Sequence, residues 1–423
     1  MLLATLLATN KCVGGQMLVK IYLFGGRFFV RNEVIMKVES GKFYFIKDEF
    51  FDVFKGYKLM DNKENGNKRP CYFCFNDPEN ERIIWFVPIS SKVDKYKTIY
   101  ENKKKTRKKV YNFVFGKVLG KEKAFLIQNI FPTTEDYIES KYQNKLQDVE
   151  ITEILKKEII ETSINVIKLA KKGIHIPFYN IIEMKNILLR NRKIEKIMQL
   201  NKNIDNISLK GTSYFEFRTE QELNEYDKKI INYYDEILEL LIEIAKEEKI
   251  QDIKVIDNMF ENYENTASQI LEEYIEELQF YSQFNMDSTK REIVALNKIK
   301  DNFKFDFEQE MTNLVDLADC YFRIGNEEKA RDLMLEFIKK NPDEDEPYQC
   351  MQNWYMYDSL NLDKLAEVID LAEKNGHVLI TDFGYDRLVK YYEMIGDTEN
   401  QQKYQELYDK WKENIKKSIC KNY

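Results

Sequence analysis

Histidine is nearly missing from this 423-residue chain, which contains only His175 and His377. Ribonucleases that use two histidines as acid and base, and metal sites built from histidine, are therefore not expected. The six cysteines are too few and too widely spread for a disulfide scaffold, which is typical of a reducing cytosol. Cys71 and Cys74 form a C-x-x-C pair, but no second pair lies nearby. We expect a cytoplasmic protein that holds neither a metal nor a cofactor.

Long hydrophobic runs are also missing, since no run approaches the roughly 20 apolar residues that cross a membrane. Residues 1–9 are apolar, but no basic segment precedes them and no small-residue cleavage site follows, so a signal peptide is not expected. Residues 1–35 combine glycine pairs with short apolar runs and show little periodicity. We expect a leader that precedes a true start at Met36, and the alternative is an extra strand over Leu18–Phe24 that joins the main sheet.

The net charge of -7 conceals an uneven distribution along the chain. Residues 1–200 carry 37 Lys and Arg against 23 Asp and Glu, a net charge of +14, and residues 201–423 carry 28 against 49, a net charge of -21. A basic half joined to an acidic half favours a nucleic-acid-binding domain followed by a module with another partner. The alternative is that surface charge simply differs between two domains.

Periodicity predicts an α+β protein in which an antiparallel sheet domain with helices, 36–200, is followed by a polar linker, 201–216, and an all-α domain, 217–423. In the first domain we expect strands over Lys42–Ile46, Tyr111–Leu119 and Ala124–Phe131, a sheet that ends at Pro132, and helices from Asp48, over 145–172 and over 179–200. In the last domain, segments around Gly325, Asn361 and Gly396 align at about 35-residue spacing, the period of tetratricopeptide-type helical hairpins. Such arrays bind protein segments, so a protein partner is expected for this tail.

The basic half is organised around residues 68–92. Lys68 and Arg69 precede the aromatic run Cys71–Phe75, a polar turn follows, and the run Ile83–Ile89 ends in Ser90-Ser91-Lys92. Two such runs around a polar turn predict a β-hairpin. The two outer ends of a hairpin are neighbours, so cations and hydroxyls are expected together at one edge of the sheet, where they can hold a phosphate.

The segment 92–109 is strongly basic and contains interleaved tyrosines. We interpret it either as a solvated loop or as a phosphate track on which Tyr96 and Tyr100 stack with bases. The RNA-binding residues predicted here and on the next strand are Lys95, Tyr96, Lys97, Lys103, Lys104, Lys105, Arg107 and Lys117.

Lysine, arginine and serine around one hairpin suit the cleavage of RNA without a metal, because the 2′-hydroxyl is an internal nucleophile. Ser90 and Ser91 can donate hydrogen bonds to a phosphate oxygen, and Lys68, Arg69 and Lys92 can neutralise its charge. A lysine crowded by other cations has a lowered pKa and can act as general base. The alternative is that the two serines only cap a turn and that Lys92 is solvated.

Four segments, in order, resemble the endoribonuclease toxins of type III toxin–antitoxin systems, the ToxN/AbiQ group, and most closely its CptN branch. They are Phe43–Phe50, Lys68–Pro70, Trp85–Lys92 and Gly116–Pro132. The resemblance covers about residues 37–190. It implies a twisted antiparallel sheet or barrel like the MazF/Kid toxins, metal-independent cleavage that leaves a 2′,3′-cyclic phosphate, and inhibition by an RNA antitoxin of pseudoknot repeats.

The resemblance also implies residue roles. A family lysine falls on Lys68 or Arg69, a Ser/Thr-Ser pair falls on Ser90 and Ser91, and a following lysine falls on Lys92 or Lys95. Residues 61–67 contain no counterpart of the family's loop tyrosine, and the tail after about 200 is not part of the usual family. The leading hypothesis is thus a phage-defence RNA-cleaving toxin with a helical tail. The alternative is a non-enzymatic RNA-binding adaptor with a helical protein-binding scaffold.

Overall fold

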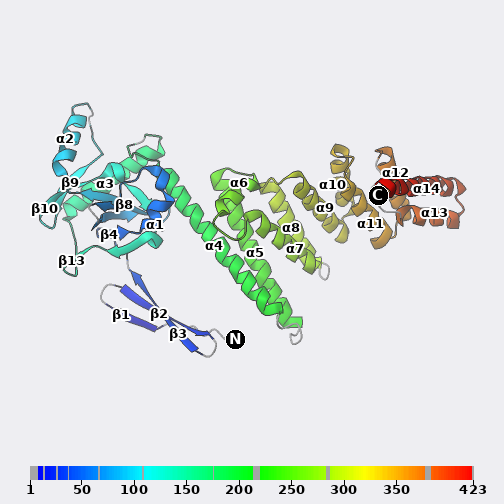
Figure 1. The fold of residues 1–423 in the computed structure, drawn as a ribbon, viewed down its shortest axis with the longest axis horizontal. Helices are drawn as coiled ribbons and strands as arrows, with labels where there is room; N and C mark the ends of the chain where they lie inside the picture. The colour runs from blue at the N-terminus through cyan, green and yellow to red at the C-terminus, as the bar shows by residue number, and fades with distance from the viewer. Residues whose placement is uncertain are drawn as a thin grey trace. The chain divides into compact units, whose positions relative to one another are not determined.

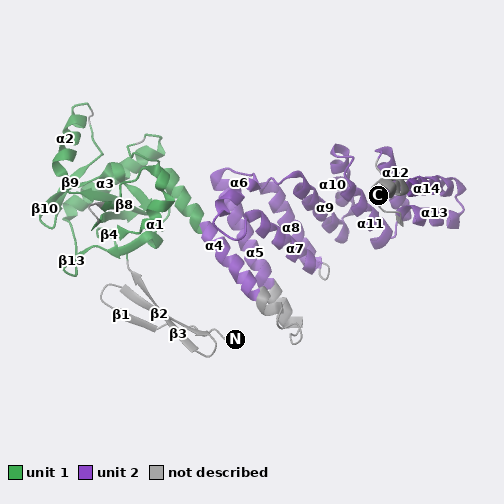
Figure 2. Ribbon diagram, in the orientation of Figure 1, with its two compact units in different colours: residues 1–192 green, residues 193–423 purple. Residues whose placement is uncertain are grey.

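The chain forms two compact units in this computed structural model, residues 1–192 and residues 193–423 (Figure 2). The boundary lies inside one helix, α4 (Ile181–Thr212). The structure describes residues 8–12, 15–24, 27–36, 38–64, 67–106, 109–174, 176–212, 220–282, 286–376 and 383–421. For residues 8–36, 64, 208–212, 220–227, 383 and 414–421 only the backbone is described.

Unit 1 is built on a seven-stranded antiparallel sheet (Figure 1). Its strands are β4 (Phe43–Ile46), β7 (Cys71–Asn76), β8 (Ile84–Ser90), β9 (Val114–Val118), β10 (Lys121–Phe125), β11 (Phe131–Thr133) and β12 (Ile138–Lys141). Their order is β12-β4-β7-β8-β10-β9, and β11 pairs with the first half of β8. The expected antiparallel sheet is confirmed, but closure into a barrel is wrong. The edge strands β12 and β9 do not pair with each other, because helices rather than a facing strand cover the sheet.

The central hairpin joins β7 to β8 as predicted, with Cys71 opposite Pro88. Both strands are almost wholly buried, and the register shifts by one residue between Phe73 and Phe75. Such a bulge increases the local twist of the sheet. The hairpin therefore forms the middle of the core, and its outer ends lie at one edge of that core.

A second hairpin, β9–β10, turns at Leu119 and Gly120, which both have left-handed backbone angles (φ 50° and 74°). Two such residues give the tight turn whose twist matches antiparallel strands. The strand expected over Ala124–Phe131 is interrupted. β10 ends at Phe125, a 3-10 turn covers Ile127–Asn129, and β11 begins at Phe131. Pro132 does not end the sheet; it lies within β11 opposite Trp85. A proline is compatible with this short strand because β11 pairs on one side only.

Helices cover both faces of the sheet. The predicted helix at Asp48 is α1 (Asp48–Val53), which buries Phe50 in the core. The helix α3 (Glu153–Lys171) begins later than expected, because the Thr152 hydroxyl caps it by accepting a hydrogen bond from the Leu155 N–H (3.4 Å). A Cβ atom at Gly116 would lie 2.2 Å from the Leu155 side chain, so glycine there lets α3 approach the sheet closely.

The segment expected to be a linker, 201–216, is helical as far as Thr212, and its last residues lie outside the described part of the chain. The polar composition of this segment hides a helical stripe. Ile197, Leu200 and Ile204 are all buried in the core of unit 2. Because this stripe has helical spacing, packing keeps the segment helical in spite of its asparagines.

Residues 8–36 contain three strands, β1 (Ala8–Cys12), β2 (Gly15–Phe24) and β3 (Arg27–Met36). They pair only with one another, in a separate antiparallel sheet. The alternative in which Leu18–Phe24 extends the main sheet is therefore wrong.

The regular elements of the described part of unit 2 are helices, as predicted, apart from one isolated β-bridge between Asp252 and Lys304 (Figure 1). Unit 2 contains the end of α4 and the helices α5 (Glu220–Glu248), α6 (Ile253–Asp257), α7 (Ala267–Ser282), α8 (Met286–Asn302), α9 (Phe307–Arg323), α10 (Glu327–Lys340), α11 (Asp345–Asn353), α12 (Leu362–Lys374), α13 (Phe383–Ile395) and α14 (Thr398–Lys421). Across the described parts of both units, every helix is too short or too polar to cross a membrane.

Three helical hairpins follow one another at the end of unit 2, α9–α10, α11–α12 and α13–α14. Their turns each contain one residue with a left-handed backbone, at Gly325 (φ 82°), Leu360 (φ 52°) and Gly396 (φ 73°). These residues lie about 35 positions apart, which is the expected repeat period. The middle hairpin departs from the others in having leucine at this position and a π-helical segment over Trp354–Asp358.

Candidate nucleic-acid interface

A groove of about 590 Å³ lies where the central hairpin ends. It is bounded by the start of β7, the residues that follow β8, and the turn between β9 and β10. Its lining residues are Asn67, Lys68, Arg69, Pro70, Ile89, Ser90, Ser91, Lys92, Val118, Leu119, Lys121, Lys123 and Tyr142. All five residues predicted to be catalytic, Lys68, Arg69, Ser90, Ser91 and Lys92, are thus brought together.

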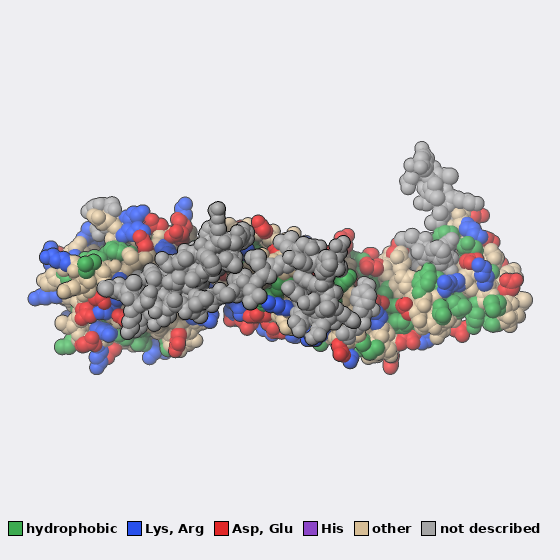
Figure 3. Space-filling view, turned by 90° about the horizontal axis from the view of Figure 1, so that it is seen from below, with side chains coloured by type: hydrophobic (Ala, Val, Ile, Leu, Met, Phe, Trp, Pro, Cys, Tyr) green, Lys and Arg blue, Asp and Glu red, His purple; other side chains and the backbone are tan. Residues whose placement is uncertain are grey.

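The charged side chains that line this groove in the described part of the chain are all positive. Five of its lining residues are Lys or Arg, and among the described residues that line it none is Asp or Glu. Lys and Arg side chains are also visible in Figure 3 at the end of unit 1 where β9 and β10 lie. Cations gathered around a hollow attract an anionic ligand and raise its local concentration. The groove therefore suits a phosphate-containing ligand.

The two serines differ in position. Ser90 ends β8 opposite Ala124 and is only 4% exposed. Its Oγ accepts a hydrogen bond from the Lys92 backbone N–H (3.2 Å), which is the turn-capping role considered as an alternative. Ser91 is exposed at the groove. Ser91 is therefore the hydroxyl better placed to reach a ligand, and Ser90 holds the turn that presents it.

Lys68 has a carboxylate partner that its sequence neighbours do not reveal. It lies in β6 (Asn67–Lys68), which pairs with β5 (Lys63–Glu64), and its ammonium forms an ion pair with Glu139 of β12. The hydrogen bond to Glu139 raises the pKa of Lys68 above its ordinary value. The expectation that crowding lowers a lysine pKa is therefore wrong for Lys68. This side chain stays protonated at neutral pH and cannot act as the base.

Arg69 and Lys92 lie on either side of the groove. The Arg69 backbone N–H donates to the Asn62 carbonyl (2.7 Å), and its guanidinium contacts the Met60 sulfur (3.8 Å). Lys92 precedes the first residue of α2 (Val93–Lys104) and is exposed. The chain direction at both points is fixed by backbone hydrogen bonds, so the two cations face a common space.

The basic segment after the hairpin is not a loop, because residues 93–104 form α2. Tyr96 and Tyr100 are half-buried and pack on Phe113 (5.2 Å between ring centroids) and Phe115 (5.8 Å). The two tyrosines thus help to attach α2 to the sheet, and their stacking on bases stays a prediction.

The other residues predicted to bind RNA lie outside the lining of the groove. They are Lys95, Lys97, Lys103, Lys104 and Lys105 on or next to α2, and Lys117 on β9. Lys97 pairs with Glu122 (2.8 Å) on the face of the sheet that α2 covers. Arg107 lies outside the described residues. These cations are therefore not part of the lining of the groove, and their contact with RNA stays a prediction.

Of the lining residues that were not predicted from the sequence, three are charged or aromatic, namely Lys121, Lys123 and Tyr142. The two lysines follow a tight turn at alternate positions of a strand, which places both on one face. That pattern was a usable signal, but only if the turn had been placed at Leu119-Gly120. Tyr142 gave no comparable signal, because it reaches the groove only through the pairing of β12 with β4.

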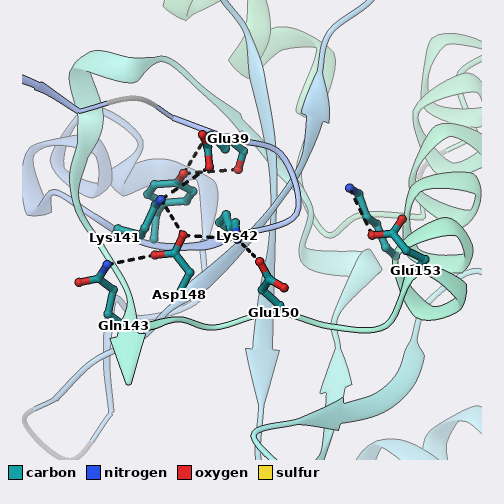
Figure 4. Close-up of polar contacts among 9 residues, drawn as sticks. Glu39, Lys42, Lys141, Gln143, Asp148, Glu150 and Glu153 are labelled. Atoms are coloured by element: carbon teal, nitrogen blue, oxygen red, sulfur yellow. Dashed lines mark hydrogen bonds and ion pairs between the residues drawn. The ribbon is translucent and has the colours of Figure 1, made fainter. Parts of the chain in front are cut away.

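A polar cluster that includes Lys141, Gln143 and Asp148 flanks Tyr142 in the chain, and these three residues are labelled in Figure 4. The residues on either side of Tyr142, Lys141 and Gln143, both bind Asp148 at 3.0 Å, and the Tyr142 backbone N–H donates to the Phe43 carbonyl (2.8 Å). Asp148 ends the hairpin formed by β13 (Gln143–Asn144) and β14 (Gln147–Asp148).

The same cluster changes the acidity of its central carboxylate. Hydrogen bonds from Gln143, and then from Lys141 and Lys42, lower the pKa of Asp148 to about 2 although partial burial opposes the shift. The carboxylate is therefore charged at neutral pH, and its charge links three segments of the chain at this edge of the sheet.

Comparisons with known proteins add no assignment, because neither the protein-family models nor the curated proteins give a match to this chain.

Proposed function

We propose that unit 1 cleaves RNA without a metal ion and that the groove at the end of the central hairpin is its active site. The observation that carries this proposal is the groove itself, where five cations and the exposed Ser91 hydroxyl surround one hollow, with no carboxylate among the described residues that line it. Such a site can bind a phosphodiester and stabilise the additional negative charge that develops during its cleavage.

In the proposed reaction, the 2′-oxygen of one nucleotide attacks the adjacent phosphorus atom, and the bond from phosphorus to the next 5′-oxygen breaks. The 2′-hydroxyl loses a proton and the departing 5′-oxygen gains one, so no water or oxidant is consumed. The products are a 2′,3′-cyclic phosphate and a 5′-hydroxyl. Holding the internal nucleophile in line with the departing oxygen is the main task of the protein.

Each groove residue has its own role in binding the phosphate or in transferring a proton. Arg69 and Lys92 neutralise the non-bridging oxygens, and the Ser91 hydroxyl donates a hydrogen bond to one of them. Lys68 is protonated at neutral pH, as any lysine with an ordinary or raised pKa is, so it can give the departing 5′-oxygen its proton.

We further propose that the chain is the toxin of a type III toxin–antitoxin system, with an RNA antitoxin of pseudoknot repeats as its inhibitor. The resemblance of four ordered segments to that family supports this, and so does the meeting of their Lys68, Ser91 and Lys92 around one groove. Tandem repeats are then expected in the DNA immediately upstream of the toxin gene, and their absence would count against an RNA antitoxin.

For unit 2 we propose a tetratricopeptide-like scaffold that binds a protein partner. The support is the succession of three helical hairpins whose left-handed turn residues recur at about 35 positions.

One observation favours an RNA-binding adaptor as the second candidate. Ser90 is occupied as a turn cap and a protonated Lys68 cannot accept the proton of the 2′-hydroxyl, so the groove has no assigned general base. The purified chain, incubated with RNA in excess EDTA, distinguishes the two functions. The proposal expects cleavage that Ser91→Ala or Lys92→Ala reduces by about 100-fold or more, whereas Lys157→Ala, at an exposed position of α3, leaves it unchanged. RNA that is bound but intact would favour the adaptor.

A further inference from the structure

We infer that Lys121 and Lys123 form a second phosphate subsite, which binds the phosphate next to the one that is cleaved. The inference rests on the proposed function and specifies its substrate class. The occupant is a short single-stranded segment of RNA with at least two consecutive phosphates.

The β9–β10 hairpin places the two lysines together. Lys121 lies opposite Val118 and Lys123 lies opposite Gly116, so both project from the face of the sheet that α3 covers. Glu122, between them, projects from the other face and pairs with Lys97 of α2. The intervening carboxylate is thus directed away from the groove.

The turn at Leu119 and Gly120 fixes where these cations lie. Both turn residues have left-handed backbone angles, so the hairpin reverses without additional residues and Lys121 begins the return strand immediately. Side chains two residues apart in a strand are separated by about 6.6 to 6.8 Å. The pair therefore presents two ammonium groups in a row along one wall of the groove.

The lysines of the groove differ in whether a carboxylate neutralises their charge. Lys68 on one wall already has Glu139 as its partner. Among the described residues, Lys121 and Lys123 form no ion pair, although Lys123 is half-buried. Two neighbouring cations without a counter-charge repel each other, and an anion that binds between them relieves this repulsion. Lys121 and Lys123 are therefore the lysines best suited to bind an additional phosphate.

The size and lining of the groove favour a single strand. Its volume of about 590 Å³ is within the usual range for small-molecule pockets, which fits a few nucleotides rather than a duplex. The lining also includes Tyr142, whose aromatic ring is half-buried against Phe43 and Phe45. An unpaired base can stack on such a ring, whereas a paired base cannot leave its duplex without cost.

The test uses the full chain with the double substitution Lys121→Gln and Lys123→Gln, and the double substitution Lys157→Gln and Lys168→Gln at exposed positions of α3 as the control that removes the same charge. Binding of a 12-nucleotide single-stranded RNA is measured as a function of salt. We expect the double variant to bind about tenfold more weakly, with a salt slope smaller by roughly 1.4, and the control to be nearly unchanged. Equal affinity of the double variant and the control would overturn the subsite.

A second measurement locates the phosphate. In two forms of an RNA with a mapped cleavage site, a neutral methylphosphonate replaces the phosphate on one or the other side of that site. For the wild-type chain, one of the two forms is expected to lower kcat/KM about tenfold, and for the double variant that form should cause no further loss. An equal additional loss in the double variant would contradict the assignment. If the wild-type chain cleaves no RNA, the proposed function fails, while the binding comparison still decides the subsite.

Discussion

At the scale of single residues, the site depends on which cations have carboxylate partners. Lys68 is paired with Glu139, whereas Lys121 and Lys123 lie on the opposite wall without a partner among the described residues. RNA that contacts Lys68 must therefore compete with Glu139 for this ammonium. The carboxylate offsets part of the positive charge of Lys68 and so reduces the attraction of the groove for RNA.

The substitution Glu139→Gln tests this competition. It removes a negative charge beside the groove, so we expect RNA to bind about three- to tenfold more tightly at low salt, and with a steeper salt dependence. Fluorescence anisotropy with single-stranded RNA measures the effect. Glu122→Gln is the control, because its carboxylate pairs with Lys97 on the other face of the sheet. Unchanged or weaker binding by Glu139→Gln would show that the carboxylate does not compete with the ligand.

Asp148 gives a prediction for pH. Hydrogen bonds from Gln143, Lys141 and Lys42 hold its folded-state pKa at about 2, below the ordinary value of 3.8. A depressed carboxylate pKa stabilises the fold above about pH 4, and this contribution is lost as the pH falls from about 4 towards 2. We expect Asp148→Asn to lower the free energy of unfolding by about 2 kcal/mol at pH 7 and by progressively less at lower pH.

Urea unfolding of both chains between pH 3 and pH 7 measures this difference. A difference that stays constant over that range would mean that Asp148 acts through packing rather than through its charge.

At the scale of elements, a buried ion pair joins the central hairpin to α4. Asp77 follows β7 and is 2% exposed; its carboxylate contacts the Lys185 ammonium (2.8 Å) and accepts a hydrogen bond from the Trp85 indole N–H (3.0 Å). Burial alone would raise the pKa of Asp77, but the hydrogen bonds, above all from Lys185, lower it. The turn between β7 and β8 is thereby fixed to the helix that leads into unit 2.

Lys185→Met should leave the Asp77 carboxylate charged, buried and without its main partner. We expect the free energy of unfolding of unit 1 to fall by about 3 to 5 kcal/mol, and the double variant with Asp77→Asn to recover part of the loss. Chemical denaturation followed by Trp85 fluorescence measures both. Lys171→Met is the control, because the partner of Lys171 among the described residues is the exposed Glu79, and its loss should cost less than about 1 kcal/mol. Equal costs for Lys185→Met and Lys171→Met would contradict a structural role for the buried pair.

At the scale of the whole molecule, the sequence predicted contacts between residues close in the chain better than contacts between distant ones. The hairpin β7–β8 was predictable because two aromatic runs flank a polar turn, and its geometry alone brings Arg69 and Ser91 to one edge. The ion pair of Lys68 with Glu139 was not predictable, since it depends on where β12 pairs.

Two segments that were expected to be a loop and a linker are helical, because apolar residues recur at helical spacing among their polar residues. In α2, Tyr96, Ile99 and Tyr100 recur at intervals of three and four residues and pack on the sheet, although the many lysines around them suggested a loop. In α4, Ile204 continues a buried stripe through a segment rich in asparagine. In both cases a few apolar side chains determined the structure, because their burial outweighs weak local propensities.

The central claim is that the groove cleaves RNA through the 2′-hydroxyl of its own substrate. The most direct measurement uses an RNA in which a single 2′-deoxynucleotide replaces the nucleotide before a mapped cleavage site, incubated with the full chain in EDTA. We predict that the unmodified RNA is cut to a 2′,3′-cyclic phosphate, and that the substituted RNA binds equally well but stays intact at that site. Cleavage of the substituted RNA at the same position would contradict this mechanism.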